Sequence, residues 1–185
     1  MKTKISSALF ILLTWCLLCM PARASVIYYL AAAPEQEIIE IQNDPALLAK
    51  FLYSGGPGKL DLDKMWHGLQ WILSGSIGIT AAPASRIILG GKEVGANLDY
   101  GKPRYFSPAE VKQIATLLSS ISVADLRKNY SAKAMDAAKV YPDDWREWER
   151  EGEDVFGGLL VNFNQLLRFY QTAASAGHAV MYAWG

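Results

Sequence analysis

The feature that most constrains the fold is a long amphipathic segment near the C-terminus, residues 155–176. Its apolar side chains recur at the three- and four-residue intervals that place them on one face of an α-helix. They are Val155, Phe156, Leu159, Leu160, Phe163, Leu166, Leu167, Tyr170 and Ala174. We therefore predict a principal core helix, ended by Gly177 in a left-handed conformation. A helix with so wide an apolar face needs a second layer to pack against.

Two segments rich in β-branched and aromatic residues are predicted to supply that layer. Residues 26–32 carry no charge, which is typical of an internal strand. Residues 178–184 form a similar run after the long helix. We expect these first and last strands to lie side by side in a small mixed sheet packed with several helices, in a single domain of the α+β class. Residues 86–89 are predicted to form a further strand.

Capping signals place the other helices along the chain. Proline at the first helical position and a serine followed three residues later by a carboxylate are both specific signals for a helix start. The predicted starts are Pro34, Pro45 after Asp44, Ser107 with Glu110, Ser122 with Asp125, and Ser131. Residues 54–58 are predicted to be a loop.

The first 24 residues have the pattern of a secretory signal peptide. Two lysines precede an apolar run over residues 5–20, and Ala22-Arg23-Ala24 provides a small-x-small cleavage site. We predict cleavage after Ala24, leaving a domain of residues 25–185 that is periplasmic or secreted. Because the apolar run is short for a membrane span, no membrane association is expected after cleavage.

Composition after cleavage excludes several classes of function. Cys16 and Cys19 both lie in the leader, so the predicted mature chain has no disulfide, thiol nucleophile or cysteine ligand for zinc. The chain keeps 15 of its 18 basic residues against 18 acidic ones, a formal charge of −3. A weakly acidic chain without basic clusters is not expected to bind nucleic acid.

The segment 60–74 combines a predicted helix start with a dense mixture of aromatic and polar side chains. Asp63 is expected to cap this helix through its carboxylate. Helical spacing then separates two faces. The predicted apolar face contains Met65, Trp66, Leu69, Ile72 and Leu73, and the polar face contains Asp63, His67, Gln70 and Ser74.

Asp63 and His67 are the candidate catalytic residues. A carboxylate one helical turn from an imidazole can orient it as a general base, and this spacing also suits two metal ligands. The alternative is structural, with Asp63 as the cap and His67 hydrogen-bonded at the edge of the core. We predict no metal site, because the only other histidine is His178. Trp66 is a candidate ligand-binding aromatic beside His67.

Two further segments contain candidate binding residues. Tyr100, Arg104 and Tyr105 lie just before a capped helix, a composition suited to holding a carboxylate or phosphate. The favoured alternative is structural, with Arg104 paired to a nearby carboxylate and the tyrosines closing the edge of the core. Trp145 lies among alternating charges in residues 141–150, where it could belong to the rim of a protein interface or anchor a loop.

These motifs, in this order, resemble those of YfbM-like bacterial proteins. The matching segments are Asn43-Asp44-Pro45, residues 60–69 with Asp63-Lys64-Met65-Trp66-His67-Gly68, Tyr100-Gly101, Arg104-Tyr105, Tyr141-Pro142, Trp145 and Phe169-Tyr170. The resemblance covers nearly all of the predicted mature chain. It implies a single α+β domain of unassigned biochemical role, so it supplies no catalytic residues. The signal peptide is the one departure from the family pattern, and it favours the bacterial periplasm.

Three hypotheses follow from the sequence. The leading one is a non-enzymatic periplasmic binding or interaction protein with a protein partner, for example of the immunity type, and with no cofactor. The second is a small-ligand or hydrolase site built from Asp63, His67, Tyr100 and Arg104, which requires these four residues to share one pocket. In the third, the central motif is structural and His67 contributes to stability alone. Oligomeric state is left open.

Overall fold

The computed structural model describes residues 25–185, and the predicted signal peptide, residues 1–24, lies outside them. The strands are β1 (Tyr28–Ala33), β2 (Lys59–Asp61), β3 (Lys92–Glu93), β4 (Arg104–Phe106) and β5 (Ala179–Trp184). The helices are α1 (Glu35–Ile41), α2 (Pro45–Tyr53), α3 (Trp66–Ser74), α4 (Arg86–Leu89), α5 (Pro108–Ser120), α6 (Val123–Asn129), α7 (Ala132–Ala137), α8 (Trp145–Arg150) and α9 (Val155–Ser175). Single 3-10 turns precede α3 (Asp63–Met65) and α4 (Pro83–Ser85). None of the described helices has the length and apolarity needed to cross a membrane.

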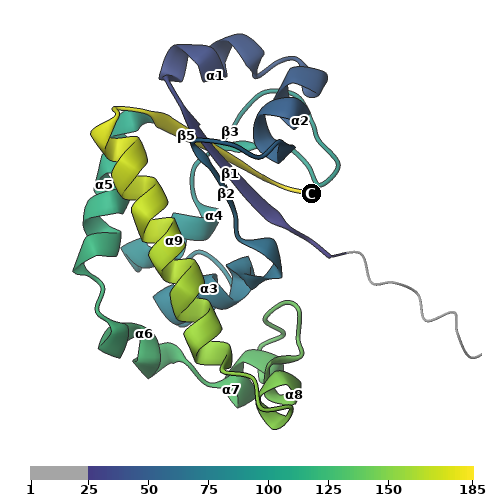
Figure 1. The fold of residues 1–185 in the computed structure, drawn as a ribbon, viewed down its shortest axis with the longest axis vertical. Coiled ribbons are helices and arrows are strands. Elements are labelled where there is room, and N and C mark those ends of the chain that lie inside the picture. The colour runs from purple at the N-terminus through teal and green to yellow at the C-terminus, as the bar shows by residue number, and fades with distance from the viewer. Residues whose placement is uncertain (1–24) are drawn as a thin grey trace, which may run out of the picture.

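The sheet has the strand order β2-β1-β5-β4-β3, with the first and last strands paired at its centre. This confirms the predicted α+β class and the predicted neighbours. All four pairings are antiparallel, so the expected mixed sheet was wrong. In Figure 1 the two helices α1 and α2 connect β1 to its antiparallel neighbour β2. A pair of helices returns the chain to the same end of the sheet, whereas a single crossover helix would produce a parallel strand.

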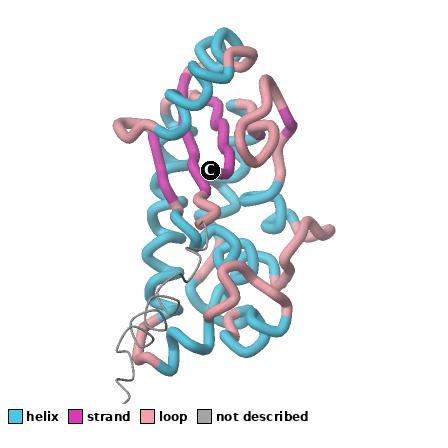
Figure 2. The backbone as a smooth tube through the Cα atoms, turned by 90° about the vertical axis from the view of Figure 1, so that its right-hand side faces the viewer, coloured by secondary structure: helices cyan, strands magenta, loops and turns pink. Residues whose placement is uncertain are grey.

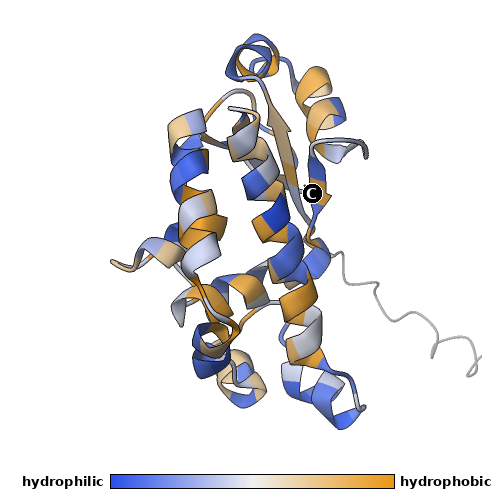
Figure 3. Cartoon of the chain, turned by 60° about the vertical axis from the view of Figure 1, so that its left-hand side comes forward, coloured by the Kyte–Doolittle hydropathy of each residue, from blue (hydrophilic) through white to orange (hydrophobic). Residues whose placement is uncertain are grey.

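Alternating side chains of the central strands face two different layers of helices. Tyr28, Leu30 and Tyr182 contribute to the larger core with α3, α5 and α9. Ala31 and Met181 contribute to a smaller core against α1 and α2. Figure 2 shows the strands between these helical layers, and Figure 3 shows that the central strands are hydrophobic. Because both faces are covered, the central strands read as continuous apolar runs.

Most helix predictions are confirmed, together with their caps. The long helix α9 packs beside α5 (Figure 1), and Gly177 follows it with φ 67°. Both predicted capping boxes are present, at Ser107 with Glu110 and at Ser122 with Asp125. These elements were predictable because their signals are local to the chain.

Residues 86–89 form the helix α4, so the predicted strand was wrong. A four-residue apolar run fits either structure by pattern alone. Long-range contacts decide the outcome here, because three side chains of the sheet hold the carbonyl groups at the end of α4. Tyr28 Oη donates to Ile88 O at 2.8 Å and Tyr182 Oη donates to Gly90 O at 2.6 Å. Arg104 Nη1 donates to Leu89 O at 3.3 Å and to Gly91 O at 3.4 Å.

Asp63 does not cap the central helix, contrary to prediction. It lies in the 3-10 turn with φ 47°, and α3 begins at Trp66 without a side-chain cap. The carboxylate that folds back at this turn belongs to Asp61, whose Oδ1 accepts from Asp63 N at 2.7 Å. The repeated Leu-Asp-Leu-Asp sequence offers two acidic positions, and spacing alone could not distinguish them.

Candidate functional site

His67 bridges two loops through both of its ring nitrogens. Its Nδ1 accepts from the backbone N–H of Tyr141 at 2.9 Å. Since Nδ1 is an acceptor, the proton of the neutral ring is on Nε2, which lies 3.2 Å from the carbonyl oxygen of Ile77. This geometry fixes the tautomer and leaves neither nitrogen free to act as a base or metal ligand. It corresponds to the structural alternative for His67.

Trp66 belongs to an aromatic cluster that joins α3 to both ends of the described chain. Its Nε1 donates to Val26 O at 3.0 Å. Its ring stacks on His67 at a centroid distance of 4.8 Å and meets Trp184 edge-on at 5.8 Å. The indole is half-buried and its only polar atom is used, so its observed role is to lock α3 against β1 and β5.

Trp145 is fully buried, so it cannot lie on the rim of an exposed surface, which was one of its two predicted roles. Its Nε1 donates to Val140 O at 2.7 Å. The indole packs directly on Gly68, where the Cβ atom of any larger residue would lie only 2.4 Å from Trp145 Cη2. The alternation of charged residues around Trp145 reflects the exposed turns of a short helix with one buried position. The Trp-His-Gly sequence of α3 is therefore a set of three packing positions.

The remaining polar side chains of α3 hold the turn that follows the helix. Gln70 was predicted to lie on an open polar face but is fully buried. Its Nε2 donates to Gly78 O at 3.1 Å, and Ser74 Oγ donates to Ser76 O at 3.1 Å. Together with His67, these residues bind the backbone of the 76–78 turn. The predicted polar face is therefore not open: Asp63 precedes α3, and His67, Gln70 and Ser74 bind the chain itself, with Gln70 Oε1 left without a partner among the described residues.

The structure does not bring Asp63, His67, Tyr100 and Arg104 into one pocket. Arg104 pairs with Glu93 at 2.9 Å and holds the end of α4. Tyr100 is 50% exposed, in the loop that packs on the α1 and α2 side of the sheet through Leu98. His67 lies on α3, on the opposite side. Tyr105 shares that side with Tyr100, where its hydroxyl is hydrogen-bonded to the Glu35 carboxylate.

We predict that His67→Ala lowers the free energy of unfolding by about 1–3 kcal/mol, because it leaves the Tyr141 amide without its acceptor. Burial lowers the pKa of His67 below its ordinary value of 6.5. The folded state therefore resists protonation, so this contribution is complete above pH 6.5 and is lost as the pH falls below it. Urea unfolding between about pH 8 and about pH 5.5 should show this loss in the wild type and less of it in His67→Ala. A His178→Ala variant is the control, and equal pH slopes in all three proteins would contradict the prediction.

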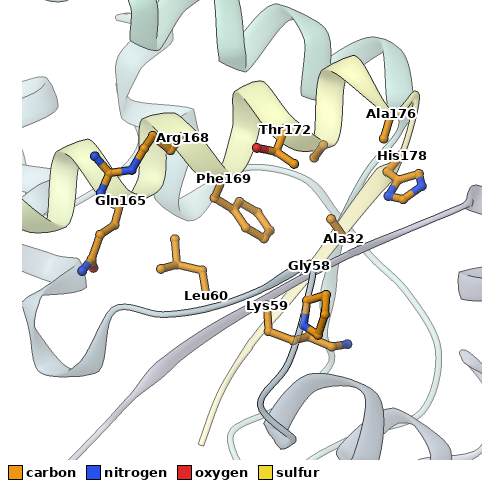
Figure 4. Close-up of a pocket in the computed structure, with 12 residues that line it drawn as sticks. Ala32, Gly58, Lys59, Leu60, Gln165, Arg168, Phe169, Thr172, Ala176 and His178 are labelled. Carbon is orange, nitrogen blue, oxygen red and sulfur yellow. The ribbon is translucent and has the colours of Figure 1, made fainter.

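The cavity that stands out chemically is a groove between α9 and the chain around β2, with a volume of about 580 Å³. Figure 4 shows Phe169 and Leu60 near its middle, Arg168 and Gln165 at one end, and His178 at the other. Its lining residues are Ala32, Pro57, Gly58, Lys59, Leu60, Gln165, Arg168, Phe169, Thr172, Ala173, Ala176 and His178. The groove thus combines an apolar floor with polar ends.

Arg168 gives the groove its charge. It is exposed and forms no ion pair with any carboxylate of residues 25–185. No acidic residue lines the groove. Lys59 also lines it, but its ammonium bonds to Phe51 O and lies 3.5 Å from the Phe51 ring centroid, on the α2 side. The groove can therefore hold an anionic group at Arg168 beside an apolar segment over Phe169.

The sequence motifs did not predict this groove. For the α9 residues that line it, the sequence predicts only a core helix over residues 155–176 and the Phe169-Tyr170 family match, and for residues 57–58 only a loop. One signal was available, because residues 155–185 contain no Asp or Glu and Arg168 is their only Lys or Arg. A helix exposed on one side normally carries charges of both signs. The long acid-free stretch indicates a surface that favours anions.

Comparison with known proteins places this architecture in a family. A family described as "Domain of unknown function (DUF1877)" matches residues 25–183. The chain belongs to this family. Protein YfbM of Escherichia coli (strain K12) is 27% identical over 126 residues, which cover 66% of this chain and 74% of YfbM. The predicted resemblance to YfbM-like proteins is therefore confirmed.

A solved structure supports the same DUF1877 fold. The crystal structure of YfbM from Escherichia coli, described as a protein of unknown function, aligns with a TM-score of 0.68 and 21% identity. The alignment covers 86% of this chain and 99% of YfbM. It shows the shared fold alone, and neither description of YfbM names a ligand. In this DUF1877 chain, no group of three or more His, Cys, Asp and Glu within residues 25–185 is arranged to hold a metal ion.

Proposed function

We propose that this chain is an exported, non-enzymatic binding protein of the DUF1877 family whose ligand occupies the groove between α9 and β2. The observation that carries the proposal is Arg168, a cation without a carboxylate partner among residues 25–185 beside an apolar floor. An exposed guanidinium in an acid-free groove favours an anionic ligand. The engaged ring nitrogens of His67 add support, since they leave no general base at the motif where catalysis was considered.

Export rests on the signal-peptide pattern of residues 1–24. In the periplasm the ligand could be a protein that presents an acidic segment, as the immunity-type hypothesis requires. Such a partner would meet the same two features, the Arg168 guanidinium and the apolar surface of Phe169 and Leu60. The proposal therefore depends on the chemistry of the groove and is tested there.

The test uses anilinonaphthalene sulfonate (ANS), a fluorescent dye that joins an apolar ring system to one anionic group. The full chain is expressed, and the protein is purified from the periplasmic fraction, where its N-terminus should be Ser25. We expect saturable ANS binding that Arg168→Glu weakens about tenfold or more, because a charged hydrogen bond is replaced by repulsion. Phe169→Ala should weaken it too, by removing apolar contact.

Lys133→Glu is the matched control, because Lys133 is an exposed lysine on α7, outside the groove lining. It reverses the same charge and should leave ANS affinity unchanged. Circular dichroism of each variant verifies that dye binding reports the folded protein. Binding that is equally strong in Arg168→Glu, or equally weakened by Lys133→Glu, would overturn the assignment of the groove. Retention of residues 1–24 on a protein found only in the cytoplasm would overturn export.

A further inference from the structure

The strand β2 is an edge of the sheet. It pairs with β1 alone and ends the strand order. The flanking contacts to β1 are made by Gly58 O, which accepts from Ala32 N at 2.8 Å, and by Leu62 N, which donates to Tyr28 O at 3.0 Å. Since backbone groups alternate in direction along a strand, the outward positions are Lys59 and Asp61.

The outward backbone of β2 offers mainly acceptors to a partner strand. Lys59 N donates to Gly56 O at 3.3 Å, within the turn that precedes β2. The carbonyl groups of Lys59 and Asp61 accept no backbone hydrogen bond from another loop or turn of residues 25–185. An extended chain could therefore add to this edge by donating its own N–H groups to these two carbonyls.

Cavities flank this edge on both faces of the sheet. The groove lies on the α9 side, and a second cavity of about 250 Å³ lies on the side of Tyr29 and Tyr53. Lys59 and Leu60 of β2 line both cavities. Side chains of an added strand point alternately to the two faces. One set would therefore enter the groove and the other set would enter the tyrosine-lined cavity.

The two cavities differ in charge, which sets the pattern of the added strand. The groove carries Arg168 and His178 without an acidic lining residue. On the tyrosine side Asp61 and Lys59 both line the cavity, so its lining pairs one acidic with one basic residue. Acidic side chains of a partner would therefore be attracted more to the groove face, which no acidic residue lines, than to the tyrosine face.

The dimensions of the groove match a short strand. The α9 residues that line it run from Gln165 to Ala176, which corresponds to about 16 Å at the helical rise of about 1.5 Å per residue. A strand advances about 3.3 Å per residue, so five or six residues span the groove. Two acidic side chains four positions apart would be about 13 Å apart. Figure 4 shows Arg168 and His178 at opposite ends of the groove, so one such side chain could lie near each end.

We infer that the ligand of the groove is an extended acidic peptide segment that adds to β2 as a sixth strand, with acidic side chains in the groove and uncharged ones between Tyr29 and Tyr53. This inference rests on the proposed function, because it names the ligand class of the same groove. Main-chain hydrogen bonds to β2 provide affinity, and the two cavities select alternate side chains. Arg168 selects the carboxylates.

The probe is a fluorescein-labelled hexapeptide, Thr-Glu-Val-Leu-Val-Glu, measured by fluorescence anisotropy with the wild-type protein. Its alternate residues place Glu, Leu and Glu on one face and Thr, Val and Val on the other. We expect saturable binding that Arg168→Glu weakens about tenfold or more and that Lys133→Glu leaves unchanged. Each glutamate changed to lysine should weaken binding similarly.

Backbone pairing is tested by methylating alternate amide nitrogens of the same peptide. One of the two methylation patterns should abolish measurable binding, because it removes the donors that face β2, while its charge and side chains stay the same. The other pattern faces solvent and should bind within about threefold of the parent, which corresponds to about 0.7 kcal/mol. Equal affinity of both methylated peptides and the parent would overturn strand addition.

The ANS experiment separates this inference from the proposed function. If ANS binds through Arg168 but the peptide does not bind, the groove is a site for small anionic amphiphiles and strand addition is wrong. If neither probe binds, both proposals fail. Sedimentation gives the remaining outcome. The wild type could form a stable dimer that the peptide cannot dissociate, and Asp61→Pro could make that dimer monomeric. This result would show that a second copy of the chain covers β2, and it would overturn the peptide inference.

Discussion

Trp145→Ala is expected to lower the free energy of unfolding by about 3–5 kcal/mol, more than any other substitution proposed for this chain. The indole is fully buried and packs on Gly68 of α3. Its removal leaves a cavity between α3, α8 and α9, and Val140 O loses one of its two donors and keeps Asp143 N. For a chain of this length the midpoint of thermal unfolding should fall by roughly 6–20 °C. Urea and thermal unfolding followed by circular dichroism measure the change.

Trp148→Ala is the matched control, because it removes the same side chain from a half-buried position three residues away on α8. Its ring meets Trp145 edge-on at 5.2 Å, so it should cost less than Trp145→Ala. Trp145→Phe should fall between the two, since it keeps apolar contact but loses the hydrogen bond. If Trp145→Ala cost no more than Trp148→Ala, the buried indole would not be a centre of packing between α3, α8 and α9.

The order of the helices could be predicted because their signals are local. The central strand pair could be predicted because both terminal segments are apolar runs typical of internal strands. Capping boxes, a proline at a first helical position and apolar periodicity each act within a few residues. Ser107 with Glu110 and the terminal glycine Gly177 were placed correctly on that basis. In α4 and at residues 61–63 the sequence pattern fits two local structures, and long-range contacts determine which one forms. Contacts such as those of Tyr28 and Tyr182 with α4 cannot be inferred from spacing.

The candidate site was less predictable for a similar reason. The sequence motif drew attention to His67 because imidazole and carboxylate one helical turn apart suit catalysis. An imidazole can equally bind backbone groups, and the structure shows that use of His67 at Tyr141 and Ile77. The groove is formed by α9 and β2, which are far apart in sequence. Arg168 belongs to no motif and Phe169 only to the Phe169-Tyr170 family match. They become a site only when the fold brings β2 beside them.

Gly68→Ala is expected to destabilise the protein by about 1–3 kcal/mol, although alanine is the better helix former by about 1 kcal/mol. A methyl group at Gly68 would lie 2.4 Å from Trp145 Cη2 and 2.8 Å from Leu159 Cδ2. Both neighbours are buried core side chains, so neither can swing into solvent. Gly158→Ala is the matched control on α9, because the nearest atom to its new methyl group is Met65 Cε at 3.9 Å. That variant should be stabilised by roughly 0.5–1 kcal/mol, so the two substitutions should have opposite signs.

A double-mutant cycle assigns the Gly68 effect to the indole. Phenylalanine at position 145 lacks the outer ring atoms that approach Gly68, so Gly68→Ala should cost less in a Trp145→Phe background than in the wild type. The cycle should therefore give a coupling of roughly 0.5–3 kcal/mol, as expected for residues in contact. Urea unfolding of the four proteins measures it. Additive costs would mean that Leu159 or the helix backbone limits position 68, whereas coupling would show that the glycine of the Trp-His-Gly sequence is required because Trp145 occupies the space of its side chain.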